Sequence, residues 1–133
     1  MNKLTGIITE IQQSGAIMLV DVAVDGHGFS ALLIESATQP LWLQTGNTID
    51  LVFKETEVTI AKVLAGIIST RNRMKCRVER IDRGELLSKI TLKFQNNTIT
   101  SAITTRAVDA LRLMIGEEVE ALVKANEISL MKK

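Results

Sequence analysis

The chain has 133 residues, a usual size for one domain or for two very small ones, and its net charge is only +1. This balance is unlike the strongly basic composition typical of nucleic-acid-binding proteins, and a hydrophobic fraction of 46% excludes global disorder. Aromatic residues make up only 3% of the chain, so we expect a core of Ile, Leu and Val.

The first half of the chain is predicted to be mostly strand. Its candidate strands are short, rich in β-branched residues and separated by glycines or polar clusters. They cover residues 4–11, 17–24, 29–33, 48–53 and 57–61. A short helix is expected over residues 35–43, between the third and fourth strands, although Pro40 weakens this helical pattern.

The second half repeats this order. Strands are expected over residues 73–82, 86–94, 98–104, 117–124 and 127–131. A helix is expected over residues 105–111, because Val108 and Leu111 are spaced for one helix face and Thr104 or Thr105 can cap it. Five strands with one short helix between the third and fourth is the order of the OB fold. The expected fold class is therefore all-β, with two tandem OB-fold-like five-stranded barrels, each with one short helix.

An internal repeat supports this division into two modules. Residues 123–130 reproduce the Lys, the Glu and the apolar positions of residues 53–60 at an offset of 70. Upstream, Ser30 is aligned with Ser101 by allowing small insertions and deletions. We expect a tandem duplication of a unit of about 65 residues, with the boundary after Gly66.

The near-neutral charge is the sum of two unlike halves. Residues 1–66 carry three basic and seven acidic residues, a net charge of −4. Residues 67–133 carry thirteen basic and eight acidic residues, a net charge of +5. The basic residues are thus concentrated in the second module.

Basic and apolar residues alternate at the start of the second module. On a strand this spacing places Arg73, Lys75 and Arg77 on one face, where the ordinary interpretation is a solvated surface balanced by acids. Arg71 differs because Ser69, Thr70 and Asn72 surround it. A guanidinium among small hydroxyl and amide donors suits a tetrahedral oxyanion.

Two further groups belong to this candidate oxyanion site. The helix expected near Thr105, preceded by Thr104, offers free backbone N–H groups. Lys124 adds a positive charge. From residue chemistry alone, sulfate, phosphate and other oxyanions all remain candidates for the ligand.

Several ordered motifs of the second module resemble the Mop family, small molybdate-binding modules of OB-like fold that are also called TOBE domains. The motifs are Ser69-Thr70-Arg71-Asn72, Lys75, Ile99-Thr100-Ser101-Ala102-Ile103-Thr104, Leu113, Gly116, Glu118-Val119 and Leu122-Val123-Lys124-Ala125. The resemblance covers about residues 69–131. Residues 4–62 look like a more divergent copy, giving a tandem arrangement.

The resemblance implies that molybdate, and tungstate with it, binds without covalent chemistry at contacts between modules or subunits. The ligand residues that it implies are Ser69, Arg71, Thr104, Lys124 and Ala125, with Asn72 as a secondary candidate. The ion is held as an oxyanion, so we expect no direct metal ligation, no catalytic residue and no organic cofactor.

The first module lacks most of these residues. Met1 stands where Arg71 does, Leu33 about where Thr104 does, and Lys54 is followed by the acidic Glu55. We therefore expect the first module to be structural and to supply little or none of the site.

The expected role is storage or homeostasis of molybdate in the cytoplasm by a homo-oligomer, with a trimer favoured over a dimer by the resemblance. The alternative is a ligand-sensing module that acts on a molybdate transporter ATPase or a regulator. No DNA-binding helix-turn-helix and no P-loop is found, which favours the first hypothesis.

Nucleic-acid binding, catalysis and membrane insertion are each disfavoured by the sequence. Single-stranded nucleic acids need aromatic stacking platforms, and an enzyme needs a His–carboxylate pair or an activated nucleophile. Neither is evident, and Cys76 and His27 are interpreted as a small apolar residue and a turn residue. No segment is predicted to span a membrane or to act as a signal peptide.

Overall fold

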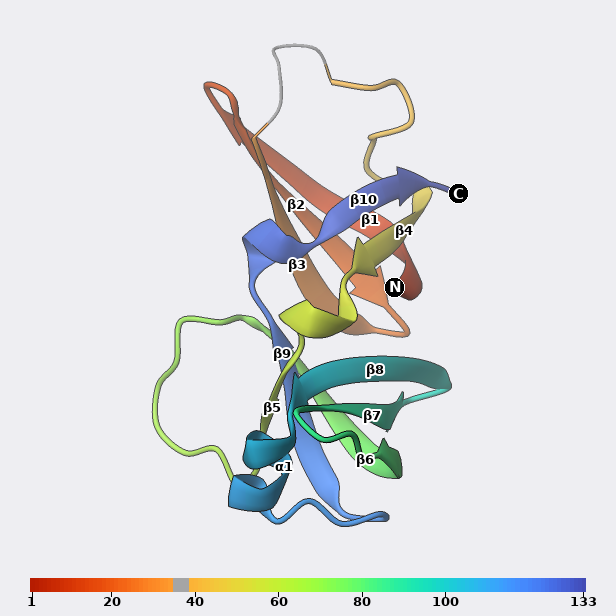
Figure 1. The fold of residues 1–133 in the computed structure, drawn as a ribbon. Coiled ribbons are helices and arrows are strands. Elements are labelled where there is room, and N and C mark those ends of the chain that lie inside the picture. The colour runs from red at the N-terminus through yellow and green to blue at the C-terminus, as the bar shows by residue number, and fades with distance from the viewer. Residues whose placement is uncertain (35–38) are drawn as a thin grey trace.

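The computed structural model describes residues 1–34 and 39–133, which form two curled sheets lying one above the other (Figure 1). The first half of the chain supplies the strands β1 (Asn2–Ser14), β2 (Ile17–Val24), β3 (His27–Ile34), β4 (Thr48–Phe53) and β5 (Thr59–Ala61). A short 3-10 turn, η1 (Glu55–Glu57), lies between β4 and β5. All five strands predicted for this half are present.

The second half supplies β6 (Asn72–Asp82), β7 (Leu87–Phe94), β8 (Asn97–Thr104), α1 (Thr105–Leu111), β9 (Glu118–Val123), η2 (Ala125–Glu127) and β10 (Ser129–Lys132). The helix predicted over residues 105–111 is confirmed with the same bounds. The predicted strands are confirmed with small differences at their ends. The two 3-10 turns were not predicted from the sequence.

The helix predicted over residues 35–43 is wrong where the structure can test it. Residues 35–38 of this prediction lie outside the described residues. Residues 39–43 contain a turn, in which the Leu43 N–H donates to the Pro40 carbonyl at 3.1 Å. Proline lacks an N–H and clashes with the preceding turn of a helix, so a helix that runs through Pro40 is unfavourable.

The two halves repeat with a constant offset of 70 residues. β2 begins at Ile17 and β7 at Leu87, and all the other described strands of the first half have counterparts at the same spacing. The alignment of Ser30 with Ser101 is therefore wrong by one residue. Ala31 is the counterpart of Ser101, because each pairs with the equivalent residue of the preceding strand.

Each sheet takes one strand from the other half of the chain. One sheet has the order β10-β4-β1-β2-β3, and the other has the order β5-β9-β6-β7-β8. β10 pairs with β4, and β5 pairs with β9, so the last strand of each half lies in the sheet built mainly by the other half (Figure 1). The expected fold class, two tandem OB-fold-like five-stranded barrels, is confirmed, and the exchange of strands ties the barrels together.

A shared aliphatic core lies within both sheets. Val20, Leu51, Ile90 and Leu92 are completely buried in one hydrophobic cluster that includes residues of both halves. The β-strand alternation explains this burial, since every second side chain of β2 and β7 points inward. Burial also raises the pKa of the Cys76 thiol to about 12, consistent with its interpretation as a small apolar residue.

Two buried asparagines join the halves at equivalent places. The Asn2 side chain donates to the Thr100 carbonyl and accepts from the Thr100 N–H, both at 2.8 Å. The Asn72 side chain makes the same pair of bonds with the backbone of Ser30, at 2.9 and 2.8 Å. The partners are again 70 residues apart, so the same contact is built twice. We call these two contacts the asparagine clamps.

No helix in residues 1–34 and 39–133 is long and apolar enough to cross a membrane.

Candidate oxyanion site

The structure brings Arg71 and Lys124 to the same end of one sheet. Asn72 on β6 pairs with Val123 on β9, so Arg71 and Lys124 are the next residues outward on these adjacent strands. Both are exposed, whereas Asn72 and Val123 are buried. Within the described part of the chain, neither Arg71 nor Lys124 has an ion-pair partner. Two positive charges are therefore presented together to solvent.

A hollow of about 250 Å³ lies beside this pair. It is lined by Lys124 and Thr70 together with Thr59, Ala61, Leu64, Ile68, Leu122 and Glu127. In the sequence, Thr70 is expected among the donors around Arg71 but not among the ligand residues. Its position next to Arg71 is the sequence feature that indicates a place in the site.

The other predicted ligand residues near this end are Ser69 and Ala125. Ser69 is exposed and lies three positions before the start of β6. Ala125 is the first residue of η2 and directly follows Lys124. Because Ala125 has no polar side chain, its backbone N–H is the group that it offers to an anion.

Asn72 has a different environment from the exposed residues around it. It is only 1% exposed, and both of its side-chain polar atoms bond the backbone of Ser30. This geometry fixes the chain immediately after Arg71. Both polar atoms of the Asn72 side chain are thus already bonded within the chain.

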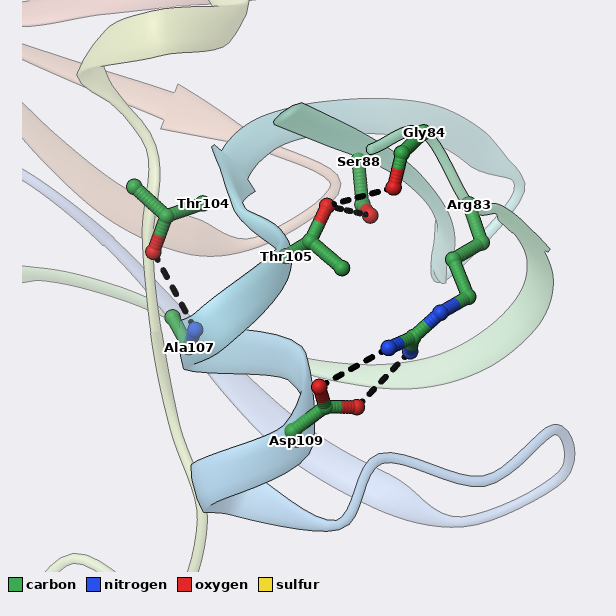
Figure 2. Close-up of polar contacts among 7 residues, drawn as sticks. All are labelled: Arg83, Gly84, Ser88, Thr104, Thr105, Ala107 and Asp109. Atoms are coloured by element: carbon green, nitrogen blue, oxygen red, sulfur yellow. Dashed lines mark hydrogen bonds and ion pairs between the residues drawn. The ribbon is translucent and has the colours of Figure 1, made fainter. Parts of the chain in front are cut away.

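Thr104 lies elsewhere, at the junction of β8 and α1 (Figure 2). Its hydroxyl oxygen accepts from the Ala107 N–H at 3.1 Å, as expected for a helix N-cap. The hydroxyl proton is left to donate to another group. Thr104 lines a separate hollow of about 610 Å³, so the chain alone does not bring it together with Lys124.

The surroundings of Thr104 are held by polar contacts on the same module (Figure 2). The buried Thr105 hydroxyl donates to the Gly84 carbonyl at 2.9 Å and lies 2.8 Å from the Ser88 hydroxyl. Arg83 forms two hydrogen bonds with the Asp109 carboxylate, at 2.7 and 2.8 Å. The Arg83 guanidinium holds the pKa of Asp109 below its ordinary value. These contacts fix the start of α1 and therefore the direction of Thr104.

The basic row on β6 behaves as an ordinary solvated strand face. Arg73 forms two hydrogen bonds of 2.8 Å with Glu120 on β9. Arg77 donates to the Gly116 carbonyl at 2.9 Å and lies 3.7 Å from Glu118. The interpretation that nearby acids balance this row is confirmed for Arg73 and Arg77, and Arg71 stands apart from it.

Comparison with known proteins places these features in a family. Residues 68–130 match the family model of the TOBE domain. The chain is 28% identical over 127 residues to the molybdenum transport protein ModE of Herbaspirillum seropedicae, covering 93% of this chain and 47% of ModE. Over 70 residues it is 39% identical to the molybdenum import ATP-binding protein ModC of Brucella abortus (strain 2308), covering 52% of this chain and 20% of ModC. The chain thus spans about half of ModE and a fifth of ModC.

A solved structure shares the complete fold. It is a crystal structure of the cytoplasmic molybdate-binding protein ModG with molybdate bound. The two chains are 25% identical and superpose with a TM-score of 0.92, covering 99% of this chain and 96% of ModG. The match extends over both sheets, including the half that the TOBE model leaves unmatched. Residues 68–130 are therefore similar to TOBE domains, and the chain as a whole resembles ModG in its fold, with two modules in tandem.

Proposed function

We propose that the chain binds molybdate non-covalently as an intact oxyanion. The observation that carries the proposal is the likeness of 99% of the chain to ModG, a protein crystallised with molybdate. The local geometry agrees with it, since Arg71 and Lys124 present two positive charges beside Thr70 and a hollow. No step of chemistry on the ion is part of the proposal.

The proposed ligand groups are the Arg71 guanidinium, the Lys124 ammonium, the Ser69 hydroxyl and the Ala125 N–H. Hydrogen bonds to charged groups contribute about 1.5–3 kcal/mol each. Four of them together can outweigh an association cost of about 4–15 kcal/mol, provided that the donors are already in place. Asn72 contributes by fixing the chain next to Arg71.

Thr104 enters the proposed site only through a second copy of the chain. Its separation from Lys124 within one chain supports the expected homo-oligomer, for which we favour a trimer over a dimer. Large apolar side chains near Thr104 are also exposed, with Leu86 at 84% and Leu87 at 58%. Contact with another copy would bury them.

The proposed role is storage or homeostasis of molybdate in the cytoplasm, with tungstate as a second ligand. ModG, which matches nearly the whole chain, is described as cytoplasmic. A second role is favoured by the similarity to ModE and ModC, proteins named for molybdenum transport and import. In that case the same site would sense the ion and act on a transporter or regulator.

Selectivity against sulfate is expected to depend on the size of the ion. Molybdate and sulfate have the same charge and shape, but the bonds from molybdenum to oxygen are longer. Donors held at fixed positions therefore fit the larger tetrahedron better.

Calorimetric titration of the full chain with molybdate, tungstate and sulfate tests the proposal. We expect binding of molybdate and tungstate, and a loss of about tenfold or more in molybdate affinity for Arg71→Ala. Arg80→Ala is the matched control, because Arg80 lies further along β6 and pairs with Asp82 at 2.8 Å. Equal affinity for sulfate would contradict the selectivity, and unchanged affinity of Arg71→Ala would remove Arg71 from the site.

A further inference from the structure

The first half of the chain carries a carboxylate at one of the proposed ligand positions. With the constant offset of 70 residues, Glu55 in η1 is the counterpart of Ala125 in η2, and Lys54 is the counterpart of Lys124. At this position the second half offers a backbone N–H with no charged side chain. The first half places a carboxylate next to its only remaining ligand-like lysine.

The Glu55 carboxylate is held in place by the other half of the chain. The Thr100 hydroxyl on β8 donates to Glu55 Oε2 at 2.5 Å, and the Lys89 ammonium lies 3.4 Å from the same oxygen. The Thr100 hydrogen bond is the main cause that lowers the pKa of Glu55 below its ordinary value, and Lys89 adds to it. Glu55 therefore remains negatively charged at neutral pH.

The remaining counterparts in the first half are apolar. Met1 stands at the position of Arg71, and Ile34 stands at the position of Thr104. Leu33, which the sequence alignment placed near Thr104, is one residue away from this position. The first half thus lacks the guanidinium and the hydroxyl, and it adds a negative charge.

We propose that Glu55 excludes oxyanions from the first half, so that the set formed by Ser69, Arg71, Lys124 and Ala125 is the only oxyanion-binding set among residues 1–34 and 39–133. Glu55 directly follows Lys54 in the chain, so a dianion bound where Ala125 and Lys124 bind one in the second half would face this carboxylate, and juxtaposed like charges are strongly unfavourable. This inference rests on the proposed function and specifies how many sites each chain supplies. It makes the two halves unequal in binding although they are equal in fold.

Equilibrium dialysis of the full chain against molybdate, with protein-bound molybdenum measured by mass spectrometry, tests the proposal. We expect Arg71→Ala to weaken all of the saturable binding by about tenfold or more and to keep no component of wild-type affinity, because no second set replaces the one that it damages. If Arg71→Ala keeps half of the bound molybdenum at wild-type affinity, the first half binds the ion and the proposal is wrong. If the wild-type chain binds none, the proposed function fails, and this proposal fails with it.

The role of Glu55 itself is tested in the Arg71→Ala background. Glu55→Gln removes the charge and keeps an oxygen to accept from Thr100, so the fold is retained. We expect this second change to raise the residual molybdate affinity by about tenfold, because the like charge near Lys54 is gone. Glu10→Gln in the same background makes the same charge change at an exposed position of β1. We expect it to leave the residual molybdate affinity unchanged. Equal effects of the two substitutions, or none from either, would overturn the role of Glu55.

Discussion

The two halves of the chain have the same fold and opposite charge. Their strands follow each other at a constant offset of 70 residues, yet residues 1–66 carry a net charge of −4 and residues 67–133 a net charge of +5. The buried counterparts are alike, for example Val20 and Ile90, or Asn2 and Asn72. The differences that bear on binding lie at exposed positions, as with Arg71 and Met1. The fold depends on the buried set, so the exposed set is free to keep a binding site in one half and lose it in the other.

The exchange of strands limits how independent the two halves are. β5 completes the sheet of the second half, and β10 completes the sheet of the first. Removing either half would leave the other with an unpaired edge and an incomplete core. We thus propose halves that are unequal in binding but joined in folding, and three measurements test this contrast.

The largest effect is expected for Leu51→Ala. Leu51 is fully buried on β4, where it lies between Leu4 on β1 and Leu130 on β10, while its counterpart in β9 is already alanine, Ala121. Removing a buried leucine side chain lowers the free energy of unfolding by about 2–5 kcal/mol. Urea unfolding followed by circular dichroism and by fluorescence of the single tryptophan, Trp42 in the first half, measures this loss.

The shape of the transition is as informative as its midpoint. We expect the two signals to give the same curve for the wild-type chain and for Leu51→Ala, because each sheet contains strands from both halves. Leu41→Ala, at a side chain that is 88% exposed, is the control and is expected to change little. A tryptophan signal that unfolds before the circular dichroism signal would show that the first half unfolds alone.

An intermediate effect is expected when each asparagine clamp is removed. Asn2→Ala leaves the backbone N–H and carbonyl of Thr100 without partners, and Asn72→Ala does the same to Ser30. Buried unsatisfied polar groups cost about 1–3 kcal/mol, so both variants are expected to lose similar stability. Only Asn72→Ala is expected to weaken molybdate binding as well, because Asn72 directly follows Arg71.

Urea unfolding and molybdate titration of both variants separate these roles. If Asn72 touched the ion and did not hold the chain, Asn72→Ala would lose affinity at unchanged stability. Equal losses of affinity in both variants would mean that the clamps act through the stability of the whole molecule.

Much of the fold could be predicted from the sequence because its signals are local. The alternation along residues 71–78 and a helix cap at Thr104 or Thr105 need only neighbouring residues to be recognised. The alternation is confirmed in β6, and Thr104 is the cap. The strand exchange could not be predicted in this way. Because the two halves are repeats, β5 and β10 could each pair with the edge of β4 or with the edge of β9. No local sequence pattern distinguishes these two pairings.

The candidate site, like the fold, could be predicted from the sequence only in part. The placement of Arg71 and Lys124 at the same end of a sheet follows from two strands whose positions were predicted. The burial of Asn72 was missed, because a polar residue next to an arginine was interpreted as a donor and its partner, Ser30, lies 42 residues away. The separation of Thr104 from Lys124 was missed too, since a sequence motif records order along the chain and not distance in space.

The smallest effect concerns an ion pair that joins the two halves, Lys62 with Glu117, and that has no charged equivalent of Glu117 at the position 70 residues away. The Lys62 ammonium donates to the carbonyls of Leu111 and Arg112, at 3.0 and 3.1 Å, and lies 2.9 Å from Glu117. It thereby ties the segment after β5 to the end of α1. The counterpart of Glu117 is Asn47, which has no charge. The hydrogen bond from Lys62 is the main cause that lowers the pKa of Glu117 below its ordinary value of 4.5.

This lowered pKa gives the pair a definite pH dependence. The unfolded chain takes up a proton on Glu117 at a higher pH than the folded chain, so the stabilisation is complete above pH 4.5 and is lost as the pH falls through the lowered value. Because both side chains are partly exposed, we expect Glu117→Gln to lower the free energy of unfolding by less than about 1 kcal/mol at neutral pH.

Urea unfolding at neutral pH and near pH 3 measures the difference in unfolding free energy between Glu117→Gln and the wild-type chain, and this difference should shrink in acid. Glu118→Gln, at a side chain that is 84% exposed, is the control. A difference that is the same at both values would mean that Glu117 stabilises the chain through its hydrogen bond to the Met114 N–H, which glutamine keeps in part, and not through its charge.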